Sequence, residues 1–152
     1  MERVCRKRVS APVNPPPPFV IVDDNHEDLF ILKRLLTRAG AKNPFISFDH
    51  AEEAVRFLGA ALRTPESHLL PSAVFSDKAM AGLNGFELLE WVRQQPPLHS
   101  TPFVLFTSVA KPGDAKRASA LGATWFYEKY PAQHVIEDLV NEIGKGRPAD
   151  RR

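Results

Sequence analysis

The sequence predicts an α/β domain in which five parallel strands form one sheet that helices cover on both faces. Two observations support this prediction. From Phe19 onwards, short apolar runs alternate with longer segments whose apolar residues recur at the helical period, and this β-α-β-α order favours a parallel sheet buried on both faces. The chain also has 152 residues, 43% of them hydrophobic, which suits one globular domain with a sizeable core.

The first strand is predicted over residues 19–22, and the helix that follows it over residues 26–39. Asn25 is a favourable N-cap residue, Asp28 stands three residues later at the capping-box position, and Gly40 is placed to end the helix. One face of this helix is apolar and is expected to pack on the sheet. Its members are Leu29, Leu32, Leu35, Leu36 and Ala39.

The remaining elements continue the alternation. A strand near residues 45–48 leads into a second helix, which we expect Asp49 to cap because Glu52 follows three residues later. The segment from Arg63 to Pro71 is predicted to be a loop. The later elements are a strand that ends at Asp77, a helix over 85–95, a strand over 103–106, a helix near 113–121, a strand over 124–127 and a helix over 132–143.

Both ends of the chain are basic. The net charge of +2 divides into +3 on residues 1–10, +3 on residues 144–152 and −4 on the rest, and residues 11–18 are rich in proline. We therefore expect a disordered basic and proline-rich tail over 1–18, a folded domain over 19–143, and a basic C-terminal tail from 144 onwards. Short basic arms without interleaved aromatic residues are typical of solubilising tails, so we do not expect nucleic-acid binding.

The composition also bears on location. No apolar stretch approaches the roughly 20 residues that span a bilayer, and the basic start lacks the apolar block of a secretory signal. The single cysteine, Cys5, cannot form a disulfide within one chain. These features predict a cytoplasmic protein that does not enter a membrane.

Acidic residues stand at the ends of two predicted strands. Asp23 and Asp24 follow the apolar run over 19–22, and Asp77 ends the run over 72–77. The carboxyl ends of neighbouring parallel strands open at the same edge of a sheet, which is where open α/β sheets place their ligand sites. Three carboxylates that converge there require a cation, so the sequence predicts a metal site at this edge.

The ordered set of strand ends resembles the receiver domain of two-component response regulators across residues 19–143. The set comprises Asp23-Asp24, Asp77 with its turn-rich loop, the run that ends in Thr107-Ser108, and Glu128-Lys129. The resemblance implies a stand-alone, CheY-like receiver with a flavodoxin-like, doubly wound sheet of strand order 2-1-3-4-5. It also implies a signalling switch in place of an enzyme.

The resemblance assigns roles to the acids. Asp77 is the residue that accepts a phosphoryl group, and Asp23 and Asp24 are the acidic pair that holds Mg²⁺ together with Asp77 and the backbone carbonyl of Ala79. Carboxylate and carbonyl oxygens are the ligands that Mg²⁺ prefers, and the ion neutralises the incoming phosphoryl group. Asp77 is then able to attack as a carboxylate nucleophile.

Three further residues take roles by the same resemblance. The hydroxyl of Thr107 bonds a phosphoryl oxygen once Asp77 is modified, and the ammonium of Lys129 pairs with the transferred group. Phe126 stands where the family carries a rotating aromatic residue that reports the change on the surface of the fourth helix, fifth strand and fifth helix. The side chains of Ala79 and Val109 cannot position a hydrolytic water, so slow dephosphorylation is expected.

The resemblance also implies partners. A sensor histidine kinase would supply the phosphoryl group, and residues 63–68 resemble a segment of receivers linked to phytochrome-type kinases. A downstream protein target or phosphotransfer protein would receive the signal. A homodimer through the surface of the fourth helix, fifth strand and fifth helix is a further expected assembly.

Three departures from the family pattern leave an alternative open. Ala81 replaces a proline and is expected to loosen the loop after Asp77, Glu128 replaces a commonly apolar residue, and Tyr130 separates Lys129 from its proline. The alternative is a phosphorylation-independent, receiver-like interaction module. A phosphatase-type hydrolase would need an Asp-x-Asp spacing, which the first strand does not supply.

Overall fold

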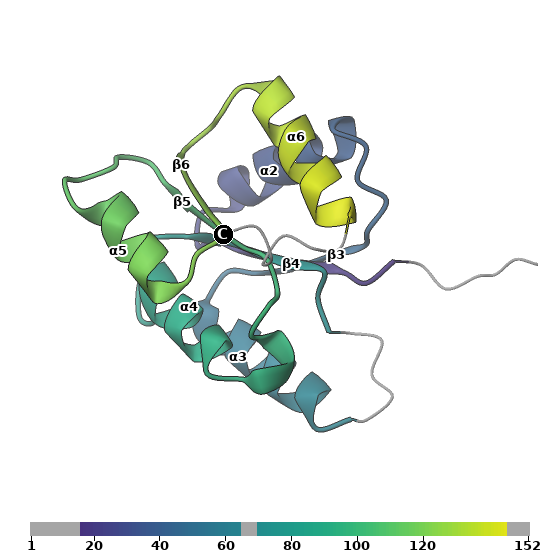
Figure 1. Ribbon diagram of the computed structural model, residues 1–152, viewed down its shortest axis with the longest axis vertical. Helices are drawn as coiled ribbons and strands as arrows, with labels where there is room; N and C mark the ends of the chain where they lie inside the picture. The colour runs from purple at the N-terminus through teal and green to yellow at the C-terminus, as the bar shows by residue number, and fades with distance from the viewer. Residues whose placement is uncertain (1–15, 65–69, 146–152) are drawn as a thin grey trace, which may run out of the picture.

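The computed structural model describes residues 16–64 and 70–145, and in these residues one five-stranded sheet forms the centre of the fold (Figure 1). All neighbouring strands are parallel, and their order is β3-β2-β4-β5-β6. Counted along the chain this is the order 2-1-3-4-5, so the predicted topology is confirmed. The strands are β2 (Phe19–Val22), β3 (Phe45–Phe48), β4 (Ala73–Asp77), β5 (Phe103–Thr107) and β6 (Trp125–Glu128).

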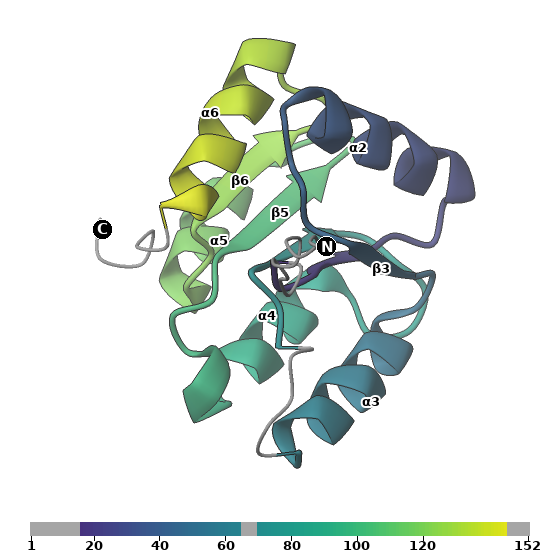
Figure 2. The ribbon, with the colours of Figure 1, turned by 90° about the vertical axis from the view of Figure 1, so that its right-hand side faces the viewer.

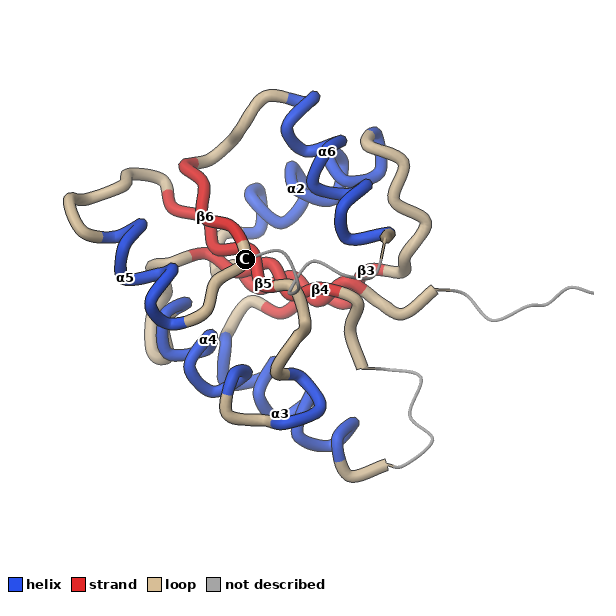
Figure 3. The backbone as a smooth tube through the Cα atoms, in the orientation of Figure 1, coloured by secondary structure: helices blue, strands red, loops and turns tan. Residues whose placement is uncertain are grey.

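Helices cover both faces of the sheet (Figures 1 and 3). On one face lie α2 (His26–Arg38) and α6 (Gln133–Gly144); on the other lie α3 (Ala51–Leu62), α4 (Gly85–Arg93) and α5 (Asp114–Leu121), with the short 3-10 helix η1 (Pro96–Leu98) after α4. Side chains of a strand alternate between the two faces. Phe19 and Ile21 accordingly pack with α2 and α6, whereas Val20 and Val22 pack with the other three helices.

The three inner strands β2, β4 and β5 are buried along their whole length. Every residue of β4 and β5 is buried, and the ring of Phe75 lies 5.2 Å from that of Phe19 and 6.5 Å from that of Phe106. Burying one phenylalanine side chain contributes roughly 1.5–3 kcal/mol. The strands that end at the acidic edge are therefore held by a tightly packed aromatic layer.

The register of the strands brings the predicted site residues to one edge. Val22 lies opposite Ser76, and Asp77 lies opposite Phe106. Asp23 and Thr107 each come one residue after these pairs, so they end up at the same edge as Asp77. In Figure 2 the arrowheads of β5 and β6 point in the same direction, as expected for parallel strands.

The start of α3 differs from the prediction. The N-cap residue is His50 and makes no side-chain cap hydrogen bond, whereas Asp49 was predicted to cap this helix. The carboxylate of Asp49 is instead 2.8 Å from Nδ1 of His50 and 3.3 Å from Nε2 of His26. Contacts with two imidazoles thus replace the expected cap.

Some predictions fall outside the described residues. These are the tails over 1–15 and 146–152 and the middle of the loop over 65–69. Just before the sheet, the carbonyl oxygen of Pro17 accepts hydrogen bonds from the side chains of Asn43 and Ser72. Within residues 16–64 and 70–145, no helix has the length and apolar character needed to cross a membrane.

Candidate functional site

Three carboxylates converge at the carboxyl edge of the sheet, as predicted. Asp23 follows β2, Asp24 lies beside the start of α2, and Asp77 is the last residue of β4. One carboxylate oxygen from each lies within 4.8 Å of the others. As whole residues, Asp23 and Asp77 are only 6% and 8% exposed, whereas Asp24 is exposed to solvent. This set of hard oxygen donors, open on one side, fits Mg²⁺, which binds few carboxylates and keeps several waters.

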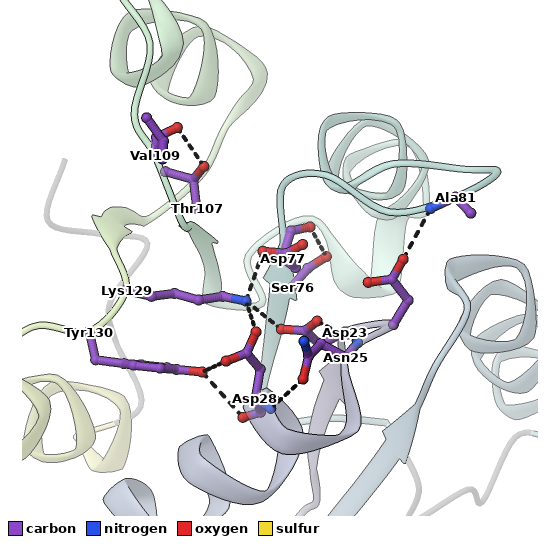
Figure 4. A network of polar contacts seen from close by, with 11 residues as sticks. Asp23, Asn25, Asp28, Ser76, Asp77, Ala81, Thr107, Val109, Lys129 and Tyr130 are labelled. Carbon is purple, nitrogen blue, oxygen red and sulfur yellow. Dashed lines mark hydrogen bonds and ion pairs between the residues drawn. The ribbon is translucent and has the colours of Figure 1, made fainter.

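The ammonium of Lys129 reaches into the same cluster (Figure 4). Its Nζ lies 2.6 Å from Asp23, 2.9 Å from Asp28 and 3.0 Å from Asp77, and only 8% of the side chain is exposed. Lys129 follows β6 directly, and the peptide bond that joins it to Tyr130 is cis. The three distances show that the lysine reaches the acids although tyrosine, not proline, follows it.

Burial and charge shift the pKa values in this cluster. Burial raises the pKa of Asp23 and of Asp77, and it exceeds the lowering effect of the hydrogen bond that each receives from Lys129. For Lys129, burial acts to lower the pKa, but hydrogen bonds to Asp23, Asp28 and Asp77 hold it above its usual value. One ammonium faces three carboxylates, and Asp24 lies beside them, so the site favours an added cation.

Two residues of the network were not predicted as site residues. Asp28 was expected to complete a capping box with Asn25, and the amide of Asp28 does donate to the side chain of Asn25 at 3.0 Å. The amide of Asn25, however, donates to Asp23 at 2.9 Å. The Asp28 carboxylate instead accepts from Lys129 at 2.9 Å and from the hydroxyl of Tyr130 at 2.8 Å.

The hydrogen bonds from Lys129 and Tyr130 also affect the pKa of Asp28. Burial acts to raise the pKa of Asp28, but the hydrogen bonds from Lys129 and Tyr130 outweigh it and lower the pKa. The phenol of Tyr130 has a raised pKa because of burial and of its bond to the carboxylate, so it stays a hydrogen-bond donor. The sequence indicated a site role for Asp28 only through its position, as an acidic residue in the first turn of the helix that begins at the site.

The helix after Asp77 begins directly behind the cluster. A β-carbon on Gly85 would collide with the carbonyl oxygen of Asp77 and lie 2.9 Å from Cα of Lys78, so only glycine fits there. Asn84 and Glu87 form a reciprocal capping box, with both hydrogen bonds at 2.9 Å. The loop that surrounds Asp77 is thereby fixed at its far end.

The loop that follows β4 is also tied to its neighbours by hydrogen bonds. The amide of Ala81 donates to Asp24 at 3.3 Å, and the amide of Leu83 donates to Glu52 of α3 at 2.8 Å. A proline at residue 81, which is usual in the family that the sequence resembles, could not donate the first of these. Ala79 is exposed in this loop, and the role of its carbonyl oxygen as a metal ligand stays a prediction.

Thr107 does not join the Lys129 cluster. It is buried at the end of β5, and its hydroxyl donates to the carbonyl oxygen of Val109 at 2.9 Å (Figure 4). No role was predicted for Glu128 from the sequence. Its carboxylate accepts a hydrogen bond from the amide of Ala110 at 2.9 Å and so holds the same loop. Phe126 is half-buried and packs against the core formed with α3, α4 and α5.

Known proteins resemble this chain in sequence. Two-component response regulator ARR16 of Arabidopsis thaliana is 30% identical over 114 residues, which cover 71% of this chain and 68% of that protein. Two-component response regulator ORR1 of Oryza sativa subsp. japonica is 29% identical over 124 residues, which cover 80% of this chain and 53% of that protein. The chain thus spans about half the length of several curated relatives that it matches.

Solved structures share the fold. The signal receiver domain of a signal transduction histidine kinase from Syntrophus aciditrophicus has a TM-score of 0.71 and 28% identity, with 86% of this chain and 91% of that chain covered. The phosphorylated cyanobacterial phytochrome response regulator RcpA has a TM-score of 0.68 and 16% identity, with 90% and 96% covered, and so shows the fold alone. The sequence model of the response regulator receiver domain matches residues 19–141. This chain therefore belongs to the response regulator receiver domain family, as the order of its strand ends predicted.

Proposed function

We propose that Asp77 accepts a phosphoryl group from a phosphohistidine of a sensor histidine kinase or a phosphotransfer protein, and that the chain signals as a phosphorylation-dependent switch. The observation that carries this proposal is the contact of 3.0 Å between the ammonium of Lys129 and Asp77, within a cluster of acids at the edge of the sheet. A carboxylate that can act as a nucleophile, an acidic pair and the ammonium of Lys129 are thus combined at one place.

The transfer is a displacement at phosphorus. An oxygen of Asp77 forms the new bond, the phosphorus–nitrogen bond of the donor breaks, and its electron pair stays with the imidazole. Lys129 holds a positive charge beside the oxygens of the transferred group. Asp23, Asp24, Asp77 and the carbonyl of Ala79 would hold Mg²⁺, which supplies neutralisation of the phosphoryl charge when it is bound.

The response to the phosphoryl group would begin at Thr107. Its hydroxyl now donates to Val109, and we expect it to leave this acceptor and bond a phosphoryl oxygen. The loop that Glu128 holds through Ala110 would move with it. Phe126 on β6 would then change its packing, and the surface of α5, β6 and α6 would become the docking face for a downstream protein or a second copy of the chain.

We propose the cytoplasm as the location of this protein, because the proposed partners are expected to act there. A phytochrome-type kinase is one class of phosphoryl donor to test, because the solved structure of RcpA, which shares the fold, is described as that of a phytochrome response regulator. The curated relatives are two-component response regulators and stress response regulators, which supports a histidine-linked donor in general. Slow self-dephosphorylation is part of the same proposal.

The second candidate function is a phosphorylation-independent interaction module. The observation that favours it is the pair of bonds that already secure the loop after β5, from Thr107 to Val109 and from Ala110 to Glu128. If these bonds persist whether or not a phosphoryl group is present, the fold would serve as a fixed docking surface. The intact acidic cluster and the position of Lys129 support the switch over this alternative.

Intact mass spectrometry tests the proposed function. The purified protein is incubated with acetyl phosphate and Mg²⁺, with an excess of EDTA in a parallel sample and Asp77→Asn as the matched variant. We expect one phosphoryl adduct in the parent with Mg²⁺, and none in the EDTA sample or in Asp77→Asn. An equal adduct in Asp77→Asn would refute the assignment of the acceptor, and no adduct from either acetyl phosphate or a phosphorylated kinase would favour the interaction module.

A further inference from the structure

We infer that Tyr130 is a positioning residue for phosphoryl transfer, because its hydroxyl acts through Asp28 to keep the ammonium of Lys129 beside Asp77. This inference rests on the proposed function of Asp77. It concerns a residue of this chain that takes the place of the usual proline after the lysine, and proline carries no hydroxyl.

The carboxylate of Asp28 is divided between two donors from the same stretch of chain. Its Oδ1 accepts from the hydroxyl of Tyr130 at 2.8 Å, and its Oδ2 accepts from Nζ of Lys129 at 2.9 Å. The ring of Tyr130 lies 6.3 Å from that of Phe106, on the buried strand next to that of Asp77. The hydroxyl is therefore positioned by a ring that packs on Phe106, and Figure 4 shows the hydroxyl directed at Asp28.

Lys129 is shared among competing acceptors. An ammonium has three donors and no preferred plane, so its position depends on how strongly each acceptor attracts it. The side chain of Asp28 is 23% exposed, against 9% for Asp23 and 9% for Asp77. Asp28 is thus the most exposed of the three acceptors, and it belongs to α2. If Asp28 attracted the ammonium more strongly, the ammonium would move away from Asp77.

The hydroxyl of Tyr130 weakens that pull. A hydrogen bond to one oxygen of a carboxylate offsets part of its negative charge, and a charged acceptor gains more from such a bond than a neutral one. With the hydroxyl present, Asp28 is satisfied on both oxygens, and Lys129 also contacts Asp77 at 3.0 Å. Without it, Asp28 would depend on Lys129 more strongly, and the ammonium would be less available to the group transferred to Asp77.

A double-mutant cycle tests this inference. The rate of adduct formation with acetyl phosphate and Mg²⁺ is measured for the parent, Tyr130→Phe, Asp28→Ala and the double variant, with Tyr127→Phe as the control. Tyr127 is a suitable control because its ring also packs on Phe106, at 6.0 Å. The affinity for Mg²⁺ is measured by titration calorimetry on each protein, since a general disturbance of the site would change both quantities.

We expect Tyr130→Phe to form the adduct about fivefold more slowly than the parent, which is the scale of one ordinary hydrogen bond, because the lost bond acts on Lys129 only through Asp28. Its affinity for Mg²⁺ should be unchanged, and in the Asp28→Ala background the same substitution should have no further effect on rate. Tyr127→Phe should match the parent.

Three outcomes would overturn the inference. If Tyr130→Phe matches a parent that is readily phosphorylated, the hydroxyl has no positioning role, although the proposed function stands. If it slows the reaction equally in the Asp28→Ala background, it does not act through Asp28. If the parent forms no adduct with any phosphoryl donor, the proposed function and this inference fail together.

Discussion

The ammonium of Lys129 lies 3.0 Å from a carboxylate oxygen of Asp77, although the two residues come from strands that are not neighbours in the sheet. β5 lies between their strands, and the lysine crosses its end to reach Asp77 and then Asp23 at 2.6 Å. The ammonium of Lys129 therefore offsets part of the negative charge of both buried acids. Two carboxylates with little exposure that lie close together need such a partner.

Removing the charge of Lys129 should destabilise the protein mainly when Mg²⁺ is absent. Lys129→Met keeps an unbranched side chain but leaves Asp23 and Asp77 without their ammonium partner, so we expect the free energy of unfolding to fall by about 3 kcal/mol in EDTA. Saturating Mg²⁺ should restore part of this loss, and adduct formation should be slower but still detectable. Urea unfolding with and without Mg²⁺ measures the difference, with the exposed Lys116→Met as control. An equal loss in both conditions would contradict the account.

Mg²⁺ should stabilise the folded protein through the acidic cluster. An ion that binds only the folded state adds about 2.7 kcal/mol at a hundredfold excess over its dissociation constant, so the midpoint of thermal unfolding should rise with Mg²⁺ and fall back with EDTA. Asp24→Asn should lose most of this shift, because Asp24 supplies the exposed oxygen of the three. Asp138→Asn, an exposed acid on α6, should keep it. Calorimetry that gives the same shift for both variants would exclude this metal site.

The phosphorylated protein should lose its phosphoryl group slowly. Val109 is 65% exposed and apolar, and Ala79 has no polar group to hold an attacking water. After the phosphoryl donor is removed, the decay of the adduct followed by mass spectrometry should take minutes or longer, and Val109→Gln should shorten it. A half-life of seconds in the parent would show that the side chains at these two positions do not limit hydrolysis.

A pH effect is expected away from the phosphoryl site. The hydrogen bond from His50 to Asp49 raises the pKa of His50, and the charge of Asp49 adds to this effect. A raised pKa in the folded state means that this pair stabilises the fold fully below about pH 6.5, the usual value in unfolded chains, and loses the effect as pH rises through the pKa of the folded state. Nuclear magnetic resonance titration should give His50 a pKa above the usual value that falls in Asp49→Asn. An unchanged value in that variant would refute the pairing.

The sequence predicted the acidic edge well because it depends on strand register and on little else. Once β2 and β4 are neighbours in a parallel sheet, Asp23 and Asp77 must emerge at the same edge. By contrast, residue 85 must be glycine because the carbonyl oxygen of Asp77 leaves no room for a β-carbon there. That close approach is not apparent from the spacing of residues in the chain.

Asp28 and Asp49 show why the rest could not be predicted. Each acid stands at or near a helix start, where local pattern predicts a capping role. In the fold, Asp28 is bonded to Tyr130, 102 residues away, and Asp49 is bonded to His26, 23 residues away. Hydrogen bonds between groups that are far apart in the chain took precedence over local caps, and only the tertiary structure brings these partners together.

The central claim is that Asp77 carries the phosphoryl group, and chemical mapping of the modified residue tests it most directly. Borohydride reduces an aspartyl phosphate to homoserine, which peptide mass spectrometry locates in the chain. After incubation with acetyl phosphate and Mg²⁺, we expect homoserine at residue 77 and not at residues 23 or 24. Homoserine at Asp23 or Asp24, or none in a sample whose intact mass shows the adduct, would contradict it.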